Sequence, residues 1–199
     1  MVPVTIDPTP AKDELRRAAI SRRRAMAPDD RFAARRANAA HLLAHLLGQL
    51  DGSAGPVCLY RPLPSEPLAE DLLTGLAEAG VDVLVPVVTG AAPLDWTRFR
   101  PHTDMGDVYL PEGDRLGPSM ISQARIVVVP AFAVDQRGYR LGRGGGHYDR
   151  TLALADPGTV RIATLFDGEG RAADLPIDRY DQPVELFVSP TPGVVPVTV

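Results

Sequence analysis

A run of four β-branched residues at positions 126–129, Ile-Val-Val-Val, constrains the fold of this chain more than any other feature. Such a run is typical of a strand buried on both faces, and such strands belong to mainly parallel sheets that helices cover on both sides. The surrounding segments also alternate, with strand patterns over 57–61, 81–88, 161–166 and 184–188 and helical patterns over 68–79 and around 151–155. Strands that alternate with helices predict an α/β fold, with a Rossmann-like, mainly parallel sheet flanked by helices. Residues 90–124 are interrupted by proline and glycine, and no element is assigned to them.

Two further helices are expected before the alternating part of the chain, over 12–26 and 29–50. In the second, apolar residues recur at spacings of three, four and seven, which is the period of an amphipathic helix; they are Phe32, Ala39, Leu42, Leu43, Leu46, Leu47 and Leu50. A length of 199 residues fits one large domain. We therefore expect a single α/β domain over 1–199, with an N-terminal helical pair (11–50) packed on it.

Composition excludes a disordered chain, a collagenous chain and a disulfide scaffold. Hydrophobic residues make up 45% and charged residues 23% of the chain, which are ordinary values for a globular protein. The single cysteine, Cys58, cannot form an intramolecular disulfide, and its apolar neighbours indicate a buried side chain rather than a catalytic thiol. The longest apolar stretch, 126–134, is too short to span a bilayer, and residues 1–10 lack the pattern of a signal peptide. We expect a cytoplasmic monomer without a membrane partner.

Charge is distributed unevenly along the chain. Residues 12–40 carry nine basic and four acidic side chains, whereas the whole chain has a formal net charge of −4. A basic segment of this kind could bind a nucleic acid or another polyanion, or it could be the solvated face of a helix. The overall acidity favours the solvated face, and no nucleic-acid partner is expected.

The most informative stretch is a glycine-rich loop that follows the buried strand and precedes a helix. Glycine occupies positions 142, 144, 145 and 146, and Arg140 and Arg143 add positive charge. Glycine lets backbone N–H groups approach a phosphate, and the start of the following helix adds the positive end of its dipole. Guanidinium groups match phosphate oxygens, and Asp149 could hold a magnesium ion that bridges them. Because the loop lacks a Walker A ending and a dinucleotide-binding fingerprint, a structural turn is the alternative to a phosphate site.

Four segments, in the same order along the chain, resemble the 5-formyltetrahydrofolate cyclo-ligase family, also called methenyltetrahydrofolate synthetases. The most specific is the signature at 138–150, Gly-x-Arg-Leu-Gly-Arg-Gly-Gly-Gly-x-Tyr-Asp-Arg, together with the strand at 129–135 that leads into it. The others are Lys12-x-x-Leu15-Arg16, Ser65-Glu66 before a helix, and Tyr-Asp-Gln-Pro-Val at 180–184. The family usually has an aromatic residue where this chain has His147, and often an acidic and a hydroxyl residue where this chain continues from Glu66 with Pro-Leu-Ala.

The resemblance implies an ATP-dependent ligase that cyclises 5-formyltetrahydrofolate to 5,10-methenyltetrahydrofolate and releases ADP and phosphate. The formyl oxygen would attack the γ-phosphate to form an imino-phosphate, and N10 of the folate would then attack the activated carbon, so that phosphate leaves. Phosphoryl transfer needs positioning and charge neutralisation more than a strong acid or base, and the sequence shows no nucleophile elbow or triad signature. Two alternatives stay open: a non-catalytic folate- or nucleotide-binding relative, and an RNA-associated protein that uses residues 12–36.

The resemblance also implies roles for individual residues. It places ATP on Lys12, Arg16, Arg140, Leu141, Gly142, Arg143, Gly144, Gly145, Gly146, His147 and Tyr148. It places the folate, with or without a polyglutamate tail, on Arg61, Glu66, Arg143, Gly144, Gly145, Gly146 and His147. Arg143 and Lys12 would serve catalysis, and Asp149 and Asp181 would hold Mg²⁺. Glu66 could accept two hydrogen bonds from the pterin, or it could simply lie in the first turn of a helix, where its charge suits the dipole.

Overall fold

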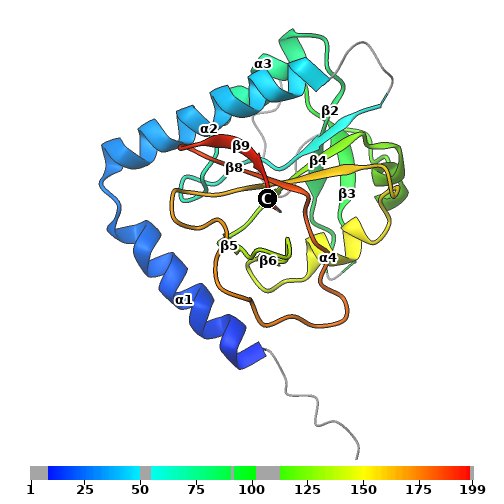
Figure 1. The fold of residues 1–199 in the computed structure, drawn as a ribbon. Coiled ribbons are helices and arrows are strands. Elements are labelled where there is room, and N and C mark those ends of the chain that lie inside the picture. Colours follow the sequence, from blue (N-terminus) through cyan, green and yellow to red (C-terminus); the bar gives the residue numbers. More distant parts are fainter. Residues whose placement is uncertain (1–8, 50–54, 91, 102–112, 198–199) are drawn as a thin grey trace, which may run out of the picture.

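The computed structural model describes residues 9–49, 55–90, 92–101 and 113–197 of the chain. Its centre is a seven-stranded sheet with the strand order β3-β2-β1-β4-β7-β8-β9 (Figure 1). The strands are β1 (Val57–Leu59), β2 (Val83–Val87), β3 (Asp95–Arg98), β4 (Ile126–Pro130), β7 (Val160–Thr164), β8 (Leu186–Ser189) and β9 (Gly193–Pro196). The five inner strands run parallel, and β3 and β9 pair antiparallel at the two edges. The predicted α/β fold with a mainly parallel sheet is therefore confirmed.

Strand β4 lies at the middle of the sheet because its side chains are apolar on both faces. It pairs with β1 on one side and β7 on the other, so that Val128 stands between Leu59 and Ile162. These three side chains are buried in the core on one face of the sheet, while Val127 and Val129 are buried in the core on the other face, as a strand covered on both faces requires.

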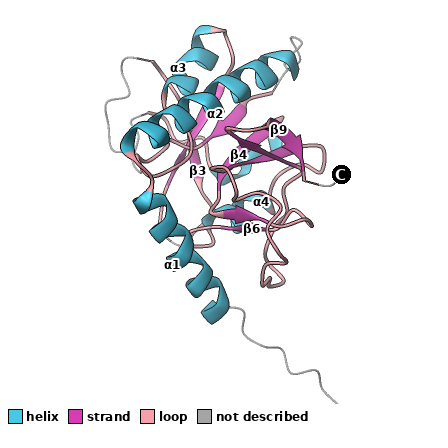
Figure 2. Ribbon diagram, turned by 60° about the vertical axis from the view of Figure 1, so that its left-hand side comes forward, coloured by secondary structure: helices cyan, strands magenta, loops and turns pink. Residues whose placement is uncertain are grey.

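Helices cover the two faces of the sheet, and each face has its own apolar core (Figure 2). The helices α2 (Pro28–Gln49) and α3 (Asp71–Glu78) cover one face, where Leu42 and Leu46 of α2 pack with Leu73 and Leu76 of α3. The 3-10 helix η1 (Pro118–Gln123) and the short helix α4 (His147–Leu152) contribute Ile121 and Leu152 to the core on the other face.

The first helix, α1 (Thr9–Ala25), packs on a small hairpin rather than on the large sheet. The hairpin consists of β5 (Ala133–Val134) and β6 (Arg140–Leu141), and Ala19 of α1 is buried with Leu141 of β6. Arg23 fixes the contact, since its Nε and Nη2 atoms donate to Glu169 at 2.8 and 2.6 Å and its guanidinium lies 4.6 Å from the centre of the Phe132 ring. In Figure 1, α1 leads into α2 at an angle and lies on the outside of this hairpin.

Several elements differ from those that the sequence predicts. Strand β3 lies within the segment 90–124, to which no element was assigned, and the sequence patterns also miss β9 and the hairpin β5–β6. The hairpin separates β4 from the glycine loop, so the buried strand does not lead directly into that loop. These strands are short and at edges, where pairing partners rather than periodicity decide the conformation. Helix α4 begins at His147, four residues before the predicted helical segment.

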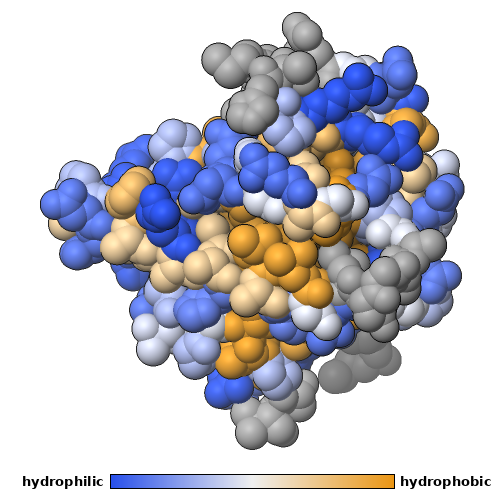
Figure 3. Space-filling model, turned by 90° about the horizontal axis from the view of Figure 1, so that it is seen from above, coloured by the Kyte–Doolittle hydropathy of each residue, from blue (hydrophilic) through white to orange (hydrophobic). Residues whose placement is uncertain are grey.

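The surface view in Figure 3 shows an area of apolar residues bordered by hydrophilic side chains. The large apolar and aromatic side chains that stay exposed come from several separate segments of the chain: Leu15, Ile20, Phe32, Leu47, Leu154, Ile177 and Tyr180. In the described part of the chain, no helix is both long enough and apolar enough to cross a membrane.

Candidate active site

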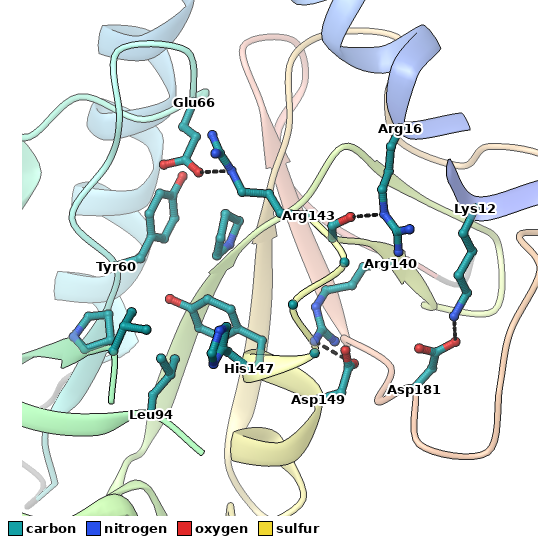
Figure 4. A pocket seen from close by; sticks show the side chains of 18 of the residues that line it. Lys12, Arg16, Tyr60, Glu66, Leu94, Arg140, Arg143, His147, Asp149 and Asp181 are labelled. Atoms are coloured by element: carbon teal, nitrogen blue, oxygen red, sulfur yellow. Dashed lines mark hydrogen bonds and ion pairs between the residues drawn. The ribbon is translucent and has the colours of Figure 1, made fainter. Parts of the chain in front are cut away.

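A cavity of about 300 Å³ opens at the carboxyl ends of the parallel strands (Figure 4). Tyr60 and Arg61 follow β1, Val88 follows β2, and Pro130 ends β4, and all four line the cavity. In open α/β sheets, ligands bind in the crevice outside these strand ends. The glycine loop and α1 complete the walls.

Two positions near the cavity require glycine, one in the turn between β5 and β6 and one in the glycine loop itself. Gly138 has a φ of +86°, and a Cβ atom there would lie 2.5 Å from the carbonyl oxygen of Val184. Gly144 has a φ of +98°, and a Cβ atom there would lie 3.2 Å from the guanidinium carbon of Arg16. The loop therefore packs directly under α1, with its backbone open to the cavity.

Arg140 ties the start of the loop to the rest of the site. Its side chain is 3% exposed, and it donates to Asp149 Oδ1 at 2.8 Å and to the carbonyl oxygen of Gln182 at 2.5 Å. Burial lowers the pKa of Arg140, although the neighbouring Asp149 carboxylate opposes this effect. The guanidinium lines the cavity, yet its two terminal nitrogens already bind protein oxygens.

Two cations of α1 close one end of the cavity. Lys12 Nζ lies 2.6 Å from Asp181 Oδ2 and 3.2 Å from Asp178 Oδ2, and the Lys12 side chain is only 10% exposed. Arg16 Nε donates to the carbonyl oxygen of Gly142 at 2.8 Å, and its Nη1 donates to Asp13 at 2.5 Å. The structure therefore brings the predicted pair Lys12 and Arg16 onto the glycine loop and onto the C-terminal aspartate.

Asp178 belongs to this end of the cavity and was missed by the sequence analysis. Partial burial opposes its ionisation, but hydrogen bonds from the Tyr180 amide and the Lys12 ammonium lower its pKa below the ordinary value. Its position three residues before Asp181, within one short turn, is the signal that could have identified it.

The two predicted metal ligands, Asp149 and Asp181, each use one carboxylate oxygen for a protein cation. Oδ1 of Asp149 accepts from Arg140, and Oδ2 of Asp181 accepts from Lys12. Within the described residues the second oxygen of each has no protein partner. No group of three or more potential ligands gathers in those residues, but Mg²⁺ commonly needs only one or two carboxylates when phosphates supply its other ligands. The donor set fits such a shared ion.

The opposite end of the cavity is apolar and contains one buried carboxylate. The Glu66 side chain is 6% exposed; its Oε2 accepts from the Leu63 amide at 2.8 Å, and its Oε1 lies 3.2 Å from Nε of Arg143. Burial raises the pKa of Glu66, although the Leu63 amide and the Arg143 charge act in the opposite direction. Figure 4 shows Tyr60, Leu94 and His147 around this end.

Tyr148 and Arg61 also line the cavity, as does His147. Arg61 is held by Glu70, with Nη2 at 2.9 Å from Oε1, and His147 Nδ1 lies 3.4 Å from the carbonyl oxygen of Ala92. Burial raises the pKa of the Tyr148 hydroxyl well above its ordinary value, so this ring stays neutral.

Of the predicted site residues, only Leu141 does not line the cavity. Successive side chains of a strand point to opposite faces, so Arg140 faces the cavity and Leu141 packs under α1 with Ala19. The cavity also has lining residues that sequence patterns did not identify, since most of them lie at the ends of strands and loops: Thr9, Tyr60, Leu63, Pro86, Val88, Leu94, Pro130 and Asp178.

The sheet, the helices on both of its faces and the position of the cavity define a Rossmann-like α/β protein with a charged, glycine-lined ligand site. A family model described as the 5-formyltetrahydrofolate cyclo-ligase family matches residues 8–190. The chain therefore belongs to the 5-formyltetrahydrofolate cyclo-ligase family, and it is a ligase.

Individual relatives agree with this assignment. The chain is 36% identical to a 5-formyltetrahydrofolate cyclo-ligase of Mycolicibacterium smegmatis, over 93% of this chain and 96% of that protein. It is 26% identical to the enzyme of the same name from Escherichia coli K12, over 69% of this chain and 79% of that protein.

Two solved structures have the same fold. The 5,10-methenyltetrahydrofolate synthetase of Aquifex aeolicus superimposes with a TM-score of 0.70 at 25% identity, covering 94% of this chain and 92% of that one. The enzyme of the same name from Mycoplasma pneumoniae superimposes with a TM-score of 0.72 at 19% identity, covering 90% and 98% respectively.

Proposed function

We propose that the protein cyclises 5-formyltetrahydrofolate to 5,10-methenyltetrahydrofolate with the hydrolysis of ATP to ADP and phosphate. The observation that carries this proposal is a single cavity with two chemically different ends, joined at Arg143. One end is apolar around the buried Glu66 carboxylate, and the other is lined by Lys12, Arg16 and the glycine loop.

The Glu66 end suits the pterin ring of the folate. A carboxylate can accept two parallel hydrogen bonds from the amino-pyrimidinone edge, as it does from a guanidinium fork. In the structure Glu66 Oε1 instead binds Arg143, whose side chain is half exposed. Pterin binding would therefore displace Arg143 from Glu66. The Arg143 guanidinium would then be available to bind the phosphates.

The opposite end suits the triphosphate of ATP. Residues 142–146 and the start of α4 line the cavity, and four of these five loop residues are glycines, which leave the backbone uncovered by side chains. Amides at such a position favour an anion. Lys12 and Arg16 lie across the loop, so ATP would exchange the contacts of Lys12 with Asp178 and Asp181 for contacts with phosphate.

The reaction then needs alignment of two substrates rather than a strong base. The formyl oxygen attacks the γ-phosphorus, the bond to the β–γ bridging oxygen breaks, and ADP leaves. N10 next attacks the formyl carbon, and the C–O bond to phosphate breaks as the N10 proton is lost. Arg143, freed from Glu66, and Lys12 neutralise the charge that develops on the transferred phosphoryl group.

We assign Mg²⁺ to Asp149 and Asp181, either directly or through water. The ion would neutralise charge on the phosphates that it shares with these carboxylates. The remaining partner assignments, a monomeric cytoplasmic protein without a nucleic-acid partner, stay predictions. Lys12 and Arg23 are buried against acidic residues, so these charges of the segment 12–40 do not face solvent. This burial supports the prediction that the protein has no nucleic-acid partner.

The proposal is tested by mixing the protein with ATP, Mg²⁺ and 5-formyltetrahydrofolate and following the near-ultraviolet absorbance of the methenyl product. We expect absorbance to rise only when all three are present, with equimolar ADP. A protein that binds the folate and ATP but forms no product would be the non-catalytic relative. Salt-sensitive RNA binding without turnover would instead support the RNA-associated alternative.

A further inference from the structure

The Glu66 carboxylate lies on a segment without helix or strand, residues 60–70, which joins β1 to α3. The turn at 63–66 is closed by its own residues. The Glu66 amide donates to the carbonyl oxygen of Leu63 at 2.9 Å, and Glu66 Oε2 accepts from the Leu63 amide at 2.8 Å. These bonds fix the shape of the turn but not its position relative to the sheet. That position depends on contacts between this segment and other elements.

Asn38 of α2 anchors the segment directly after Glu66. The Asn38 side chain is buried, and its Nδ2 donates to the carbonyl oxygen of Pro67 at 2.6 Å and to that of Leu165 at 2.9 Å. Leu165 follows β7, and its own amide donates to the carbonyl oxygen of Val188 in β8 at 2.9 Å. Asn38 therefore ties the residue after Glu66 to the carboxyl end of β7.

Asn38 is a polar residue in the buried stripe of α2, beside Ala39 and Leu42. Both of its partners are carbonyl oxygens, so the side-chain amide must direct its two N–H groups toward them. Its Oδ1 is consequently buried without a hydrogen-bond partner in the described part of the chain. A buried acceptor without a partner costs folding free energy, and such a cost is typical of positions that support a functional site.

Arg35 holds the next residue of the same segment. It lies three residues before Asn38, on the same face of α2, and its Nε donates to the carbonyl oxygen of Leu68 at 2.9 Å. Helix α2 thus binds two consecutive carbonyl groups, those of Pro67 and Leu68. Neither Asn38 nor Arg35 is among the described residues that line the cavity, so any effect of theirs on a ligand must act through Glu66 and its segment.

We propose that Asn38 and Arg35 are positioning residues that set the affinity for the pterin ring by fixing Glu66 relative to the strand ends. The proposal rests on the proposed function, in which Glu66 accepts two parallel hydrogen bonds from the pterin. Paired hydrogen bonds require both carboxylate oxygens to be aligned, so a small displacement of the segment weakens both of them.

The test measures the Kd of 5-formyltetrahydrofolate by equilibrium dialysis with the full chain, without ATP. Wild-type protein is compared with Asn38→Ala, Asn38→Leu and Arg35→Met. Leucine has the branched shape of asparagine without its donors, and methionine keeps an apolar stem in place of that of arginine. Thermal melting, methenyl product formation and the KM for ATP at saturating folate are recorded for each protein.

Thr159→Val is the matched control. Thr159 is also buried, and its hydroxyl donates to a backbone carbonyl oxygen, that of Ala124, at 2.8 Å. It lies directly before β7, at the amino end of the strand, whereas the cavity opens at the carboxyl ends. The control therefore removes a buried hydrogen bond of the same kind away from Glu66.

We expect Asn38→Ala and Asn38→Leu to raise the Kd for the folate roughly tenfold, a loss typical of removing groups that orient a ligand-binding side chain. Arg35→Met should raise it less, because it removes one hydrogen bond. The KM for ATP should stay unchanged in all three. Thr159→Val should lower Tm and leave the Kd for the folate at its wild-type value.

A second comparison asks whether Asn38 acts through Glu66. Asn38→Ala is introduced into a Glu66→Ala variant, and the Kd for the folate is measured in both. If Asn38 acts only by positioning the carboxylate, it should have no further effect once the carboxylate is gone. An undiminished tenfold loss in the Glu66→Ala background would overturn the proposal.

Folded Asn38 and Arg35 variants that bind the folate within about threefold of wild type, less than 1 kcal/mol, would also overturn it. If neither Asn38 variant folds, Arg35→Met decides, because Arg35 lies on the partly exposed side of the contact. Folate binding by wild-type protein without methenyl product would be a failure of the proposed function. Normal product formation with unchanged affinity in the variants would be a failure of this inference alone.

Discussion

Replacement of Arg143 by alanine should lower kcat/KM strongly while it lowers folding stability only slightly. Arg143 is half exposed, and its Nε lies 3.2 Å from Glu66. An ion pair of this exposure contributes at most about 1 kcal/mol to folding, which corresponds to a fall in Tm of about 2–4 °C for a chain of this size. The loss of charge beside Glu66 should also raise the pKa of that carboxyl further.

The effect on catalysis should be much larger. If Arg143 neutralises charge on the transferred phosphoryl group, its removal costs about 2–4 kcal/mol of transition-state stabilisation. This range corresponds to a roughly 30- to 1000-fold fall in kcat/KM. Arg143→Lys keeps the charge but not the planar fork, so it should recover only part of the loss.

The assay is initial rate against substrate concentration, with thermal melting of each variant. Arg98→Ala is the matched control: Arg98 is also half exposed, its Nε lies 3.1 Å from Asp82, and it does not line the cavity. The control should leave kcat/KM unchanged and lower Tm by no more than Arg143→Ala does, because its partner Asp82 is 42% exposed whereas Glu66 is 6% exposed. An Arg143→Ala variant with kcat/KM within about threefold of wild type, well under 1 kcal/mol, would refute the role given to Arg143.

Three further changes test the remaining assignments. Asp149→Asn should raise the Mg²⁺ concentration needed for half-maximal binding of ADP in equilibrium dialysis, because an amide oxygen ligates Mg²⁺ less strongly than a carboxylate. Lys12 is the only lysine in the chain, so Mg²⁺-ATP should protect it, but not the α-amino group of Met1, from an amine-reactive reagent, and Lys12→Ala should raise the KM for ATP. The KM for folate should rise as pH falls through the raised pKa of Glu66, and Glu66→Gln should remove this pH dependence.

Each of these changes has an outcome that would contradict it. An unchanged Mg²⁺ midpoint in a folded Asp149→Asn variant would exclude Asp149 from the metal site. Equal labelling of Lys12 with and without ATP, together with a wild-type KM for ATP in the variant, would remove Lys12 from the nucleotide site.

For Glu66, melting gives a second measurement with a defined sign. The folded protein holds the Glu66 proton more tightly than the unfolded chain does, because burial raises the pKa. Ionisation therefore costs folding stability as pH rises through that pKa, and Glu66→Gln should raise Tm relative to wild type at neutral pH but not in acid. The same difference in Tm at both pH values would show that burial does not raise the pKa of Glu66 in the folded protein.

Local patterns in the chain were sufficient to predict those elements that have a regular apolar repeat or a distinctive residue composition. The apolar repeat that includes Leu42 and Leu46 predicts α2, and the β-branched run predicts the central strand β4. The glycines of the loop and the charges of Arg140 and Arg143 predict a phosphate-binding loop, and in the structure this loop lines the cavity. In each case the physical cause lies within a few consecutive residues, so it is visible without the fold.

Other features depend on contacts between residues far apart in the chain, and only the tertiary structure decides them. Lys12 meets Asp178 and Asp181 more than 160 residues later, and Arg143 binds Glu66 across the cavity. No local pattern specifies which carboxylate an arginine or lysine will bind, because many are within reach of an unfolded chain. Folding brings the strand ends, α1 and the 178–182 turn together, and burial then decides which of these charges pair with each other and which stay available to a ligand.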